Sequence, residues 1–538
     1  MTTTMAVPLT AAPGRVLTRL IARQTWRGAL VVTGAATALS ALVAVQFRST
    51  FAGQLGADSI RALAENPAVR MLFGPARALD DPGGFTVWRT GIPVLVLCGV
   101  WALLTATRLT RGQEEAGQTE LLLAGRLRPL DLLTRTTGVS AALGAVIAAS
   151  VGAGLIAAGT DPVGAVLHAL CVLGVAATFA AVGMLAAQLA PTRAGASGSA
   201  AAVLAASLLA RMIADGVPAL AWAAWLTPFG TAARVAPYAE NNPAPLLVLA
   251  GLAVVPAMAA FVVAGARDLG AAPLARARGR APRTRLLGSP GGFALRRAIA
   301  PTAAWAAGIG AYFLLIGAMT ASILEFFATN IRFAELAAAA GFGGLSSAPG
   351  FAAALLAILA VPAGLYAAAR IADMAAAEQA RRCTALHAGT AGRTRLAGAE
   401  IAVTTAGLAV LLLTAAVSMA AGARLTGAPL TLTDTLTGAA NVAPVALLGL
   451  GAATLALGWY PRAVTAVGAV PVAGGFLLDV TAQSVGAPAW VTRVSPFAHL
   501  APVPDAPPNW AATLVFLAVA TVLALLGLYG YQRRDLTG

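Results

Sequence analysis

The stretch that decides the fold is residues 137–188, which read TGVSAALGAVIAASVGAGLIAA, then GTDP, then VGAVLHALCVLGVAATFAAVGMLAAQ. A helix needs about 20 consecutive apolar residues to cross a hydrocarbon core of ~30 Å. Both runs reach that length and both are continuous, whereas the strands of a membrane barrel would alternate apolar and polar residues over ~10 positions. We therefore predict two membrane-spanning α-helices joined by a short turn.

Ten further apolar windows of similar length lie before and after this stretch. Hydrophobic residues make up 59% of the 538-residue chain and charged residues 11%, against roughly 25% charged in a soluble domain. No soluble core could bury twelve such helices, so the predicted fold class is an all-α integral membrane protein with about twelve transmembrane helices. The predicted spans are 29–47, 91–107, 137–158, 163–188, 196–214, 246–265, 302–324, 351–369, 401–421, 439–458, 463–482 and 510–531.

The sequence repeats itself after about half its length. The segment Trp222–Phe229, WAAWLTPF, has a counterpart in Trp490–Phe497, WVTRVSPF. Each is followed by a Pro-rich stretch and one apolar run, and these runs end in ARDL (266–269) and RRDL (533–536). Each half has six predicted spans. Because six is an even number, each half begins and ends on the same side of the membrane. The two halves therefore have the same orientation, and the repeat must be parallel. We predict a fused pseudo-dimer of two parallel six-helix repeats, with a central pathway between the halves.

Arginines gather in one set of loops. Of the 36 arginines, 26 fall in segments on the same side as both termini, which the positive-inside rule places in the cytoplasm. The formal net charge of +15 indicates contact with anionic membrane lipids and not with nucleic acid. We predict a multi-pass protein of a bacterial plasma (inner) membrane with both termini cytoplasmic. The predicted domains are 1–28, a cytoplasmic tail with an amphipathic interfacial helix; 29–265, the first six-span half; 266–297, an Arg/Pro/Gly-rich cytoplasmic linker with a second interfacial helix; and 298–538, the second six-span half.

The N-terminal segment carries four arginines spaced four residues apart. Apolar side chains lie between them, which predicts an amphipathic helix along the inner membrane interface with its cations toward the lipid headgroups. The alternative is a simple topology signal. The four residues are Arg15, Arg19, Arg23 and Arg27.

The loop between the second and third spans, RGQEEAGQTELLLAGR (111–126), is the most distinctive cytoplasmic feature. Arg111 and Glu115 have the i,i+4 spacing of a helical ion pair, and the triplet Leu121–Leu123 is predicted to be exposed. A short amphipathic helix with this triplet would dock in a groove of a cytosolic protein. The alternative is that Glu114 and Glu115 solvate a helix end. The matching loop of the second half is a degenerate copy whose charged residues are Glu378, Arg381 and Arg382.

The chain contains no lysine. A P-loop ATPase needs the lysine of GxxxxGK[ST] to reach the β- and γ-phosphates, so this chain cannot contain such a site. Neither HExxH nor GxSxG nor a paired-carboxylate arrangement is present, and Cys98, Cys171 and Cys383 are too scattered for a disulfide framework or a metal site. We predict that the chain is not an enzyme, holds no cofactor, and would need a second chain for nucleotide-driven work.

The segment RGQEEAGQTELLLAGRLR (111–128) resembles the signature of the permease subunits of ATP-binding cassette (ABC) type-2 exporters. With NPAVRMLFGPARALDDPGGFTVWRTG (66–91) and the repeated Pro-Phe elements, nearly the whole chain is similar to the fused twelve-span actinobacterial polyketide-antibiotic (tetronasin-like) exporter permeases. The resemblance implies a coupling helix that docks on a separate ATPase subunit, two copies per permease, with ATP and Mg bound on that partner. The residues it assigns to coupling are Glu114, Glu115, Gly117, Glu120, Leu121, Leu122 and Leu123, with Glu378, Arg381 and Arg382 in the second copy.

Ionisable residues inside membrane spans are costly and are therefore functional candidates. The candidates are His168, Arg211, Asp215 and Asp479. Arg211 and Asp215 lie one helical turn apart and are predicted to neutralise each other. Asp479 is either an acid in a polar vestibule or a helix-end residue, and His168 is either a helix-packing residue or a proton relay. Residues 48–90 and 325–348 are predicted to cap the outer mouth.

The predicted function is export of amphiphilic drugs or polyketide-type antibiotics by a permease that a partner ATPase powers. The sequence offers few charges to line a pathway, which favours amphiphilic cargo over ions or sugars. The alternative is a proton-coupled twelve-span drug antiporter, with Asp215 and Asp479 as its candidate proton carriers. Such antiporters keep a short loop with a Gly-rich Asp-Arg motif after the second span, and this loop is long and lacks it. A third class is a non-transporting scaffold or a lipid-processing enzyme.

Overall fold

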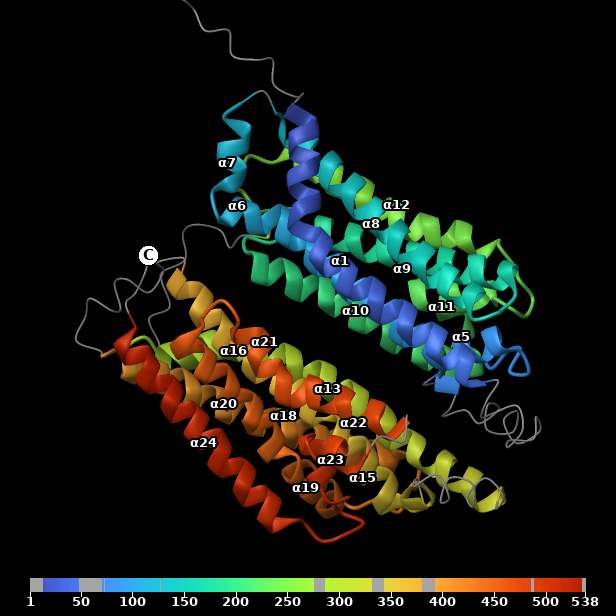
Figure 1. The fold of residues 1–538 in the computed structure, drawn as a ribbon, viewed down its shortest axis with the longest axis vertical. Coiled ribbons are helices and arrows are strands. Elements are labelled where there is room, and N and C mark those ends of the chain that lie inside the picture. Colours follow the sequence, from blue (N-terminus) through green and yellow to red (C-terminus); the bar gives the residue numbers. More distant parts are fainter. Residues whose placement is uncertain are drawn as a thin grey trace, which may run out of the picture. The chain divides into compact units, whose positions relative to one another are not determined.

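The computed structural model describes residues 13–47, 70–71, 73–125, 127–274, 286–330, 343–379, 392–484 and 488–534. Within these ranges the chain forms helices, turns and loops, without a strand. It divides into two compact units, Met1–Arg280 and Ala281–Gly538, and each is described here by itself (Figure 1). The predicted all-α fold is confirmed.

The helices of the first unit begin at strong start signals. Asp81, Asp161 and Thr192 each accept a hydrogen bond from a backbone N–H of the following first turn, and the first two precede a proline. Such side chains satisfy backbone donors that the helix leaves free. The elements are α1 (Pro13–Gln46), α5 (Pro82–Thr107), η2 (Arg108–Gly112), α6 (Gln113–Glu115), α7 (Gln118–Leu123), α8 (Pro129–Ala157), α9 (Pro162–Leu189), α10 (Arg193–Gly216), η3 (Pro218–Leu226), α11 (Pro228–Val235) and α12 (Pro245–Ala266).

The second unit contains a similar series of helices. Its first helix is the longest, with 40 residues. The elements are α13 (Pro290–Thr329), η4 (Gly343–Ser346), α15 (Ala348–Ile358), α16 (Ala360–Gln379), α18 (Arg393–Leu425), α19 (Leu432–Asn441), α20 (Ala443–Trp459), α21 (Val464–Ala469), η5 (Val470–Gly474), α22 (Gly475–Ser484), α23 (Ala489–Thr492), η6 (Pro496–His499) and α24 (Trp510–Arg533).

Eleven of the twelve predicted spans are helices long and apolar enough to cross a membrane, among the residues that the structure describes. The exception is the window 463–482, where α21 and α22 are separated by the π-helical turn η5. Pro471 lies in this turn and has no N–H to donate to the preceding turn of helix, which explains the break in the α-helical pattern. The eleventh predicted span is therefore a shorter apolar helix that contains a π-helical turn.

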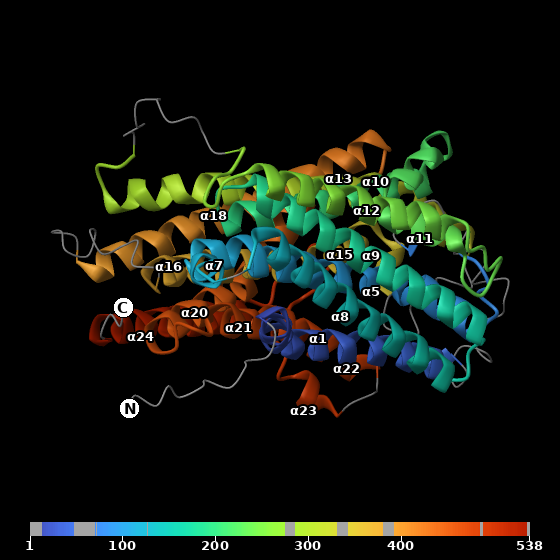
Figure 2. The same cartoon turned by 90° about the horizontal axis from the view of Figure 1, so that it is seen from above.

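The two units repeat one packing scheme. In the first, α1 packs on α8, α5 on α9 and α9 on α12; in the second, α13 packs on α18, α16 on α20 and α20 on α24. In both units the first span thus contacts the third, the second the fourth, and the fourth the sixth. Figure 2 shows α1 beside α8 in the first unit. The half-chain sequence repeat is accordingly also a repeat of helix packing.

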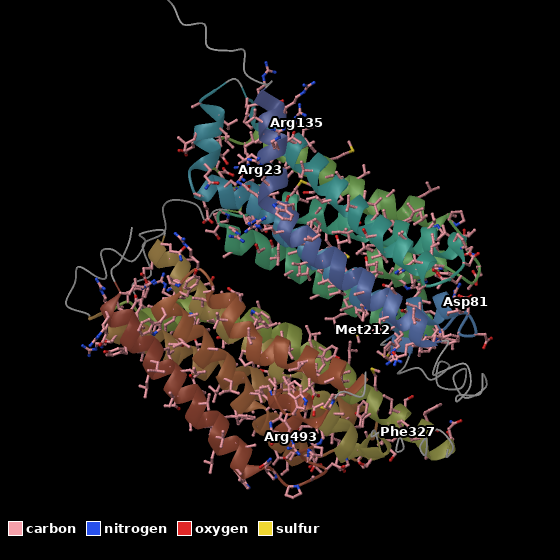
Figure 3. All side chains as sticks on the ribbon, in the orientation of Figure 1. Arg23, Asp81, Arg135, Met212, Phe327 and Arg493 are labelled. Atoms are coloured by element: carbon pink, nitrogen blue, oxygen red, sulfur yellow. The ribbon has the colours of Figure 1, made fainter. Side chains whose placement is uncertain are left out.

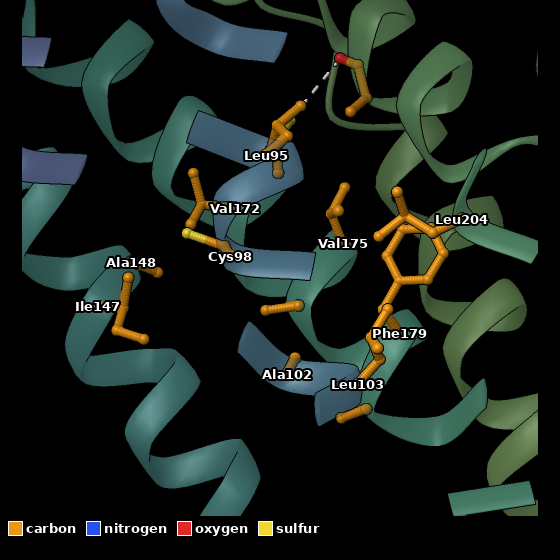
Figure 4. Packing of buried hydrophobic residues seen from close by; sticks show 14 of the residues in the cluster. Leu95, Cys98, Ala102, Leu103, Ile147, Ala148, Val172, Val175, Phe179 and Leu204 are labelled. Carbon is orange, nitrogen blue, oxygen red and sulfur yellow. Dashed lines mark hydrogen bonds between the residues drawn. The ribbon is translucent and has the colours of Figure 1, made fainter. Parts of the chain in front are cut away.

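Small residues bring the helices of each pair close together. A Cβ added at Gly183 of α9 would meet the Leu103 backbone of α5 at 2.9 Å, and one at Gly317 of α13 would meet the Met419 carbonyl oxygen of α18 at 2.0 Å. Close approach of this kind favours helix association in lipid. In the first unit, Figure 4 shows Leu103, Val175 and Phe179 among the buried side chains of the resulting core.

Candidate functional site

The second span of the first unit extends past its predicted end. Helix α5 continues through the π-helical turn η2 into α6, so that one helical segment runs from Pro82 to Glu115. The chain then turns at Gly117, whose φ of +70° is a left-handed conformation that favours glycine, and enters the short helix α7. The loop predicted from its sequence is thus a helical extension followed by a small separate helix.

Glu114 is the centre of a buried polar cluster at this end of the unit. Arg267 donates from its two terminal nitrogens to the two carboxylate oxygens of Glu114, at 2.9 and 2.8 Å, and the Gly270 N–H donates to the same carboxylate at 2.7 Å. Arg111 forms an ion pair with Glu114 at 3.1 Å. The i,i+4 spacing had predicted Glu115, the next residue, as the partner of Arg111. The Glu114 side chain is 9% exposed, so it is committed to contacts inside the chain.

These cations also bind the ends of two other helices. Arg111 donates to the carbonyl oxygens of Ala187 in α9 and Ala271 after α12, at 2.9 and 3.2 Å. Arg267 donates to the Gln188 side chain at 2.8 Å. The cluster therefore joins the ends of α6, α9 and α12. A buried ion pair of this kind holds only while both partners are present, because either one alone is an uncompensated buried charge.

The leucines of α7 divide between two faces. Leu122 packs against the cluster of Leu17, Ile21, Leu109 and Val139, whereas Leu121 is 79% exposed. The prediction that the whole triplet is exposed is therefore wrong for Leu122 and for Leu123, which is half-buried. Consecutive helical residues point in directions about 100° apart, so three in a row cannot share one face.

The outward side of α7 carries one acid beside Leu121. Glu120 is exposed, and Glu115, at the end of α6, is exposed as well and accepts a hydrogen bond from the Arg193 N–H at 3.0 Å. Among the predicted coupling residues of this loop, the exposed ones are thus Glu115, Glu120 and Leu121, and Glu114 lies beneath them.

The N-terminal arginines lie on the exposed side of α1. Arg15, Arg19, Arg23 and Arg27 are all exposed, while Leu17 and Ile21 between them are buried. The amphipathic segment and the first span form one continuous helix, Pro13–Gln46, and Figure 1 shows the first turns of α1 beside α7 running at an angle to the rest of the helix.

The second unit has its own polar contacts at the matching place. Glu378 of α16 forms an ion pair with Arg534, which follows α24, as Glu114 does with Arg267 after α12. Arg393 donates to the Arg534 carbonyl oxygen at 3.0 Å. The other two predicted coupling residues of this half, Arg381 and Arg382, lie outside the described residues.

A further buried ion pair in the second unit was not predicted. Glu400 of α18 pairs with Arg370 of α16, and Arg297 of α13 lies 3.9 Å from its other oxygen. Glu400 and Arg370 are both 2% exposed. Glu400 falls one residue before the predicted span 401–421, and its position beside an apolar run was the signal that could have identified it.

Three of the four polar span candidates, His168, Arg211 and Asp215, lie toward the opposite end of the first unit, and Asp479 belongs to the second unit. Figure 3 shows Arg23 and Arg135 at the α7 end and Asp81 at the other. Near Asp81's end, the Arg211 Nε lies 2.6 Å from Asp215 Oδ2, which confirms their predicted pairing. His168 is 3% exposed and lines a pocket with Arg211. Asp479 is a half-buried residue of α22. Of the two segments predicted to cap the outer mouth, residues 48–69 and 72 of the first and 331–342 of the second lie outside the described residues.

The long apolar helices, and the buried ion pairs that hold their ends together, define a multi-pass membrane protein. Comparison with known proteins identifies its kind. The family model described as "Multidrug efflux system permease Rv1217c, C-terminal domain" matches residues 287–532. The multidrug efflux system permease protein Rv1217c of Mycobacterium tuberculosis is 30% identical over 495 residues, covering 89% of this chain and 87% of that protein. The chain belongs to the family of multidrug efflux system permeases, and it is a drug-efflux transport subunit.

Proposed function

We propose that this chain is the membrane permease of an ABC exporter that moves amphiphilic drugs or polyketide-type antibiotics out of the cell, in the manner of the tetronasin-like exporters. ATP, with Mg, is bound and hydrolysed on a separate ATPase subunit, two copies of which bind each permease. Both termini and α7 face the cytoplasm. The absence of any lysine supports a separate ATPase, because the chain cannot build a P-loop of its own.

The observation that carries the proposal is the form of the α6–α7 segment. It presents an exposed leucine, Leu121, flanked by the exposed acids Glu115 and Glu120, and such a short amphipathic helix suits a groove on a partner protein. Beneath it, Glu114 and the two arginines bind α6 to the ends of α9 and α12. A displacement of α7 would therefore be transmitted to several spans at once.

The four exposed arginines of α1 suit the same arrangement. They lie on the same helix whose buried face contacts Leu122 of α7. Arginines of an interfacial helix bind anionic lipid headgroups, so the bilayer would support the helix on which α7 rests. This contact would hold the docking helix at a fixed height above the membrane.

The experiment is a binding measurement between the purified chain and the ABC ATPase encoded beside it. Leu121→Asp and Glu120→Arg should each weaken binding by tenfold or more. The matched control is Glu240→Arg, which reverses an exposed acid between α11 and α12. Equal affinity of all three variants and the unaltered chain would show that α7 is not the docking element.

The energy source is tested by transport in sealed vesicles. Drug accumulation should require ATP and the ATPase subunit and should persist when an uncoupler collapses the proton gradient. Transport that an uncoupler abolishes and that ATP depletion leaves intact would instead support a proton-coupled antiporter.

A further inference from the structure

The first unit contains a second candidate site, at the end of the bundle opposite α7. A cavity of about 70 Å³ lies between the loop of residues 73–77 and helices α5, α9, α10 and α11. A cavity needs at least ~10–15 Å³ of such volume to hold one water, so this one has room for more than a single water or for a compact head group. Its mouth opens to the surface, which leaves room for a longer tail to extend outward.

The charges that line this cavity have one sign. Arg77, Arg211 and His168 contribute the ionisable side chains of the lining, and among the described residues that line it none is an acid. Each arginine also has an acidic partner outside the lining: Glu240 lies 2.7 Å from Arg77, and Asp215 lies 2.6 Å from Arg211. Arg211 is 0% exposed and His168 3%, so these two are built into the wall and are not surface groups that happen to lie near it. A guanidinium in a site of low polarity is a strong donor to a carboxylate or phosphate oxygen.

The rest of the wall is apolar, with three aromatic rings among small and aliphatic residues. Phe73, Trp88 and Phe229 line it, with several aliphatic and small residues. A few polar groups in an otherwise apolar concave surface are typical of a small-molecule site. This composition suits a molecule with an anionic oxygen at one end and hydrocarbon at the other.

The roof of the cavity is held in place over Arg211. Trp88 donates through its indole N–H to the Gly74 carbonyl oxygen at 3.2 Å, and the Phe73 and Trp88 rings lie 5.2 Å apart. Gly74 has a φ of +94°, and a Cβ there would lie 2.3 Å from an Arg211 nitrogen. The glycine thus permits the loop to close directly on the guanidinium, which shields the site from bulk water.

We infer that this cavity binds the anionic head group of an amphiphile, either a free long-chain carboxylate or the phosphate of a lipid. The inference concerns one unit and is independent of the energy source of transport. It assigns Arg211 and His168 a role in binding, in addition to the ion pair of Arg211 with Asp215.

The test uses the purified full chain in phosphatidylcholine nanodiscs and tritiated palmitic acid, with empty nanodiscs subtracted. Saturable binding is expected at one palmitate per chain. Excess unlabelled palmitic acid should displace it, and hexadecanol, which has the same tail without the charge, should be at least tenfold less effective. Displacement of palmitate by phosphatidic acid would identify a lipid phosphate as the bound head group. If phosphatidic acid does not displace palmitate, the bound group is a free carboxylate.

The decisive variant fills the cavity without disturbing the fold. A Cβ at Gly91 would lie 3.5 Å from Val87 and 3.7 Å from His168, which are ordinary contacts, so Gly91→Leu should occupy the space and weaken binding at least tenfold. Gly251→Leu is the matched control, since nothing lies within 4 Å of that position. Arg77→Gln, at the rim, should weaken palmitate binding and leave hexadecanol binding unchanged. Unsaturable binding, equal displacement by hexadecanol, or unchanged affinity in Gly91→Leu and Arg77→Gln would overturn the inference.

Discussion

Arg267 donates to both carboxylate oxygens of Glu114 across 153 residues of sequence, at 2.9 and 2.8 Å. The second unit pairs Glu378 with Arg534 at the corresponding helix ends. In both cases an acid at the end of the second span binds an arginine that follows the sixth. The repeat has therefore kept the contact, although the surrounding sequence has diverged. This conservation between the halves favours a role in holding the second and sixth spans together.

Breaking the Glu114 cluster should destabilise the first unit. Glu114→Gln leaves the buried Arg111 and the partly buried Arg267 without this carboxylate, and removal of one member of a buried pair costs about 3–5 kcal/mol. We expect a lower melting temperature by scanning fluorimetry and reduced drug transport. Glu240→Gln, which breaks the exposed pair with Arg77, should leave the melting temperature unchanged, since exposed pairs contribute ~0–1 kcal/mol. Equal effects of the two variants would refute the structural role of Glu114.

The buried pair of the second unit should behave as a coupled pair. Arg370→Met alone leaves Glu400 largely uncompensated, with Arg297 3.9 Å away as its remaining partner. Arg370→Met combined with Glu400→Leu removes both charges and should be more stable than the single variant, because replacing a buried pair by apolar residues is often neutral. Denaturation of the unaltered chain, of these two variants and of Glu400→Leu alone measures the coupling. Strictly additive losses would show that the two side chains act independently.

Helix contact in the second unit should be sensitive to one methyl group. Gly317→Ala would place a Cβ 2.0 Å from the Met419 carbonyl oxygen, so α13 and α18 must move apart, at a cost of about 1–3 kcal/mol or more. Gly308→Ala in the same helix meets nothing within 4 Å and should be neutral or slightly stabilising. The yield and thermal stability of the two variants check this prediction. It fails if Gly317→Ala melts like the unaltered chain.

Tyr238 should make stability depend on pH in the alkaline range. Burial raises the pKa of its phenol to about 12, and the nearby carboxylates of Asp81 and Asp161 act in the same direction. The unfolded chain loses this proton near pH ~10, so the stability that the neutral phenol provides is complete below pH ~10 and is lost as pH rises toward about 12. Tyr238→Phe should flatten this part of the curve of unfolding free energy against pH. A curve that keeps its slope in the variant would assign the effect to another group.

Much of the candidate site was predictable from local sequence. The i,i+4 spacing of Arg211 and Asp215 predicted an ion pair that forms, and the spacing of Arg15 and Arg19 predicted a helix face that is exposed. Local spacing could not predict that Glu114 is buried, because its partner Arg267 follows a different span. For the same reason Glu400 and Arg370 were missed.

The sequence alone determined that this chain is a helical membrane protein built from a repeat, because length and continuity of apolar runs suffice to make lipid-spanning helices. It also determined, through the absence of lysine, that a P-loop is impossible. Tertiary structure decided that Leu121 points outward while Leu122 is packed, and that the helix containing Pro471 has a π-helical turn. It also decided that Glu114 anchors three helix ends. These outcomes depend on which helices lie side by side, and packing between distant segments selects that arrangement in three dimensions.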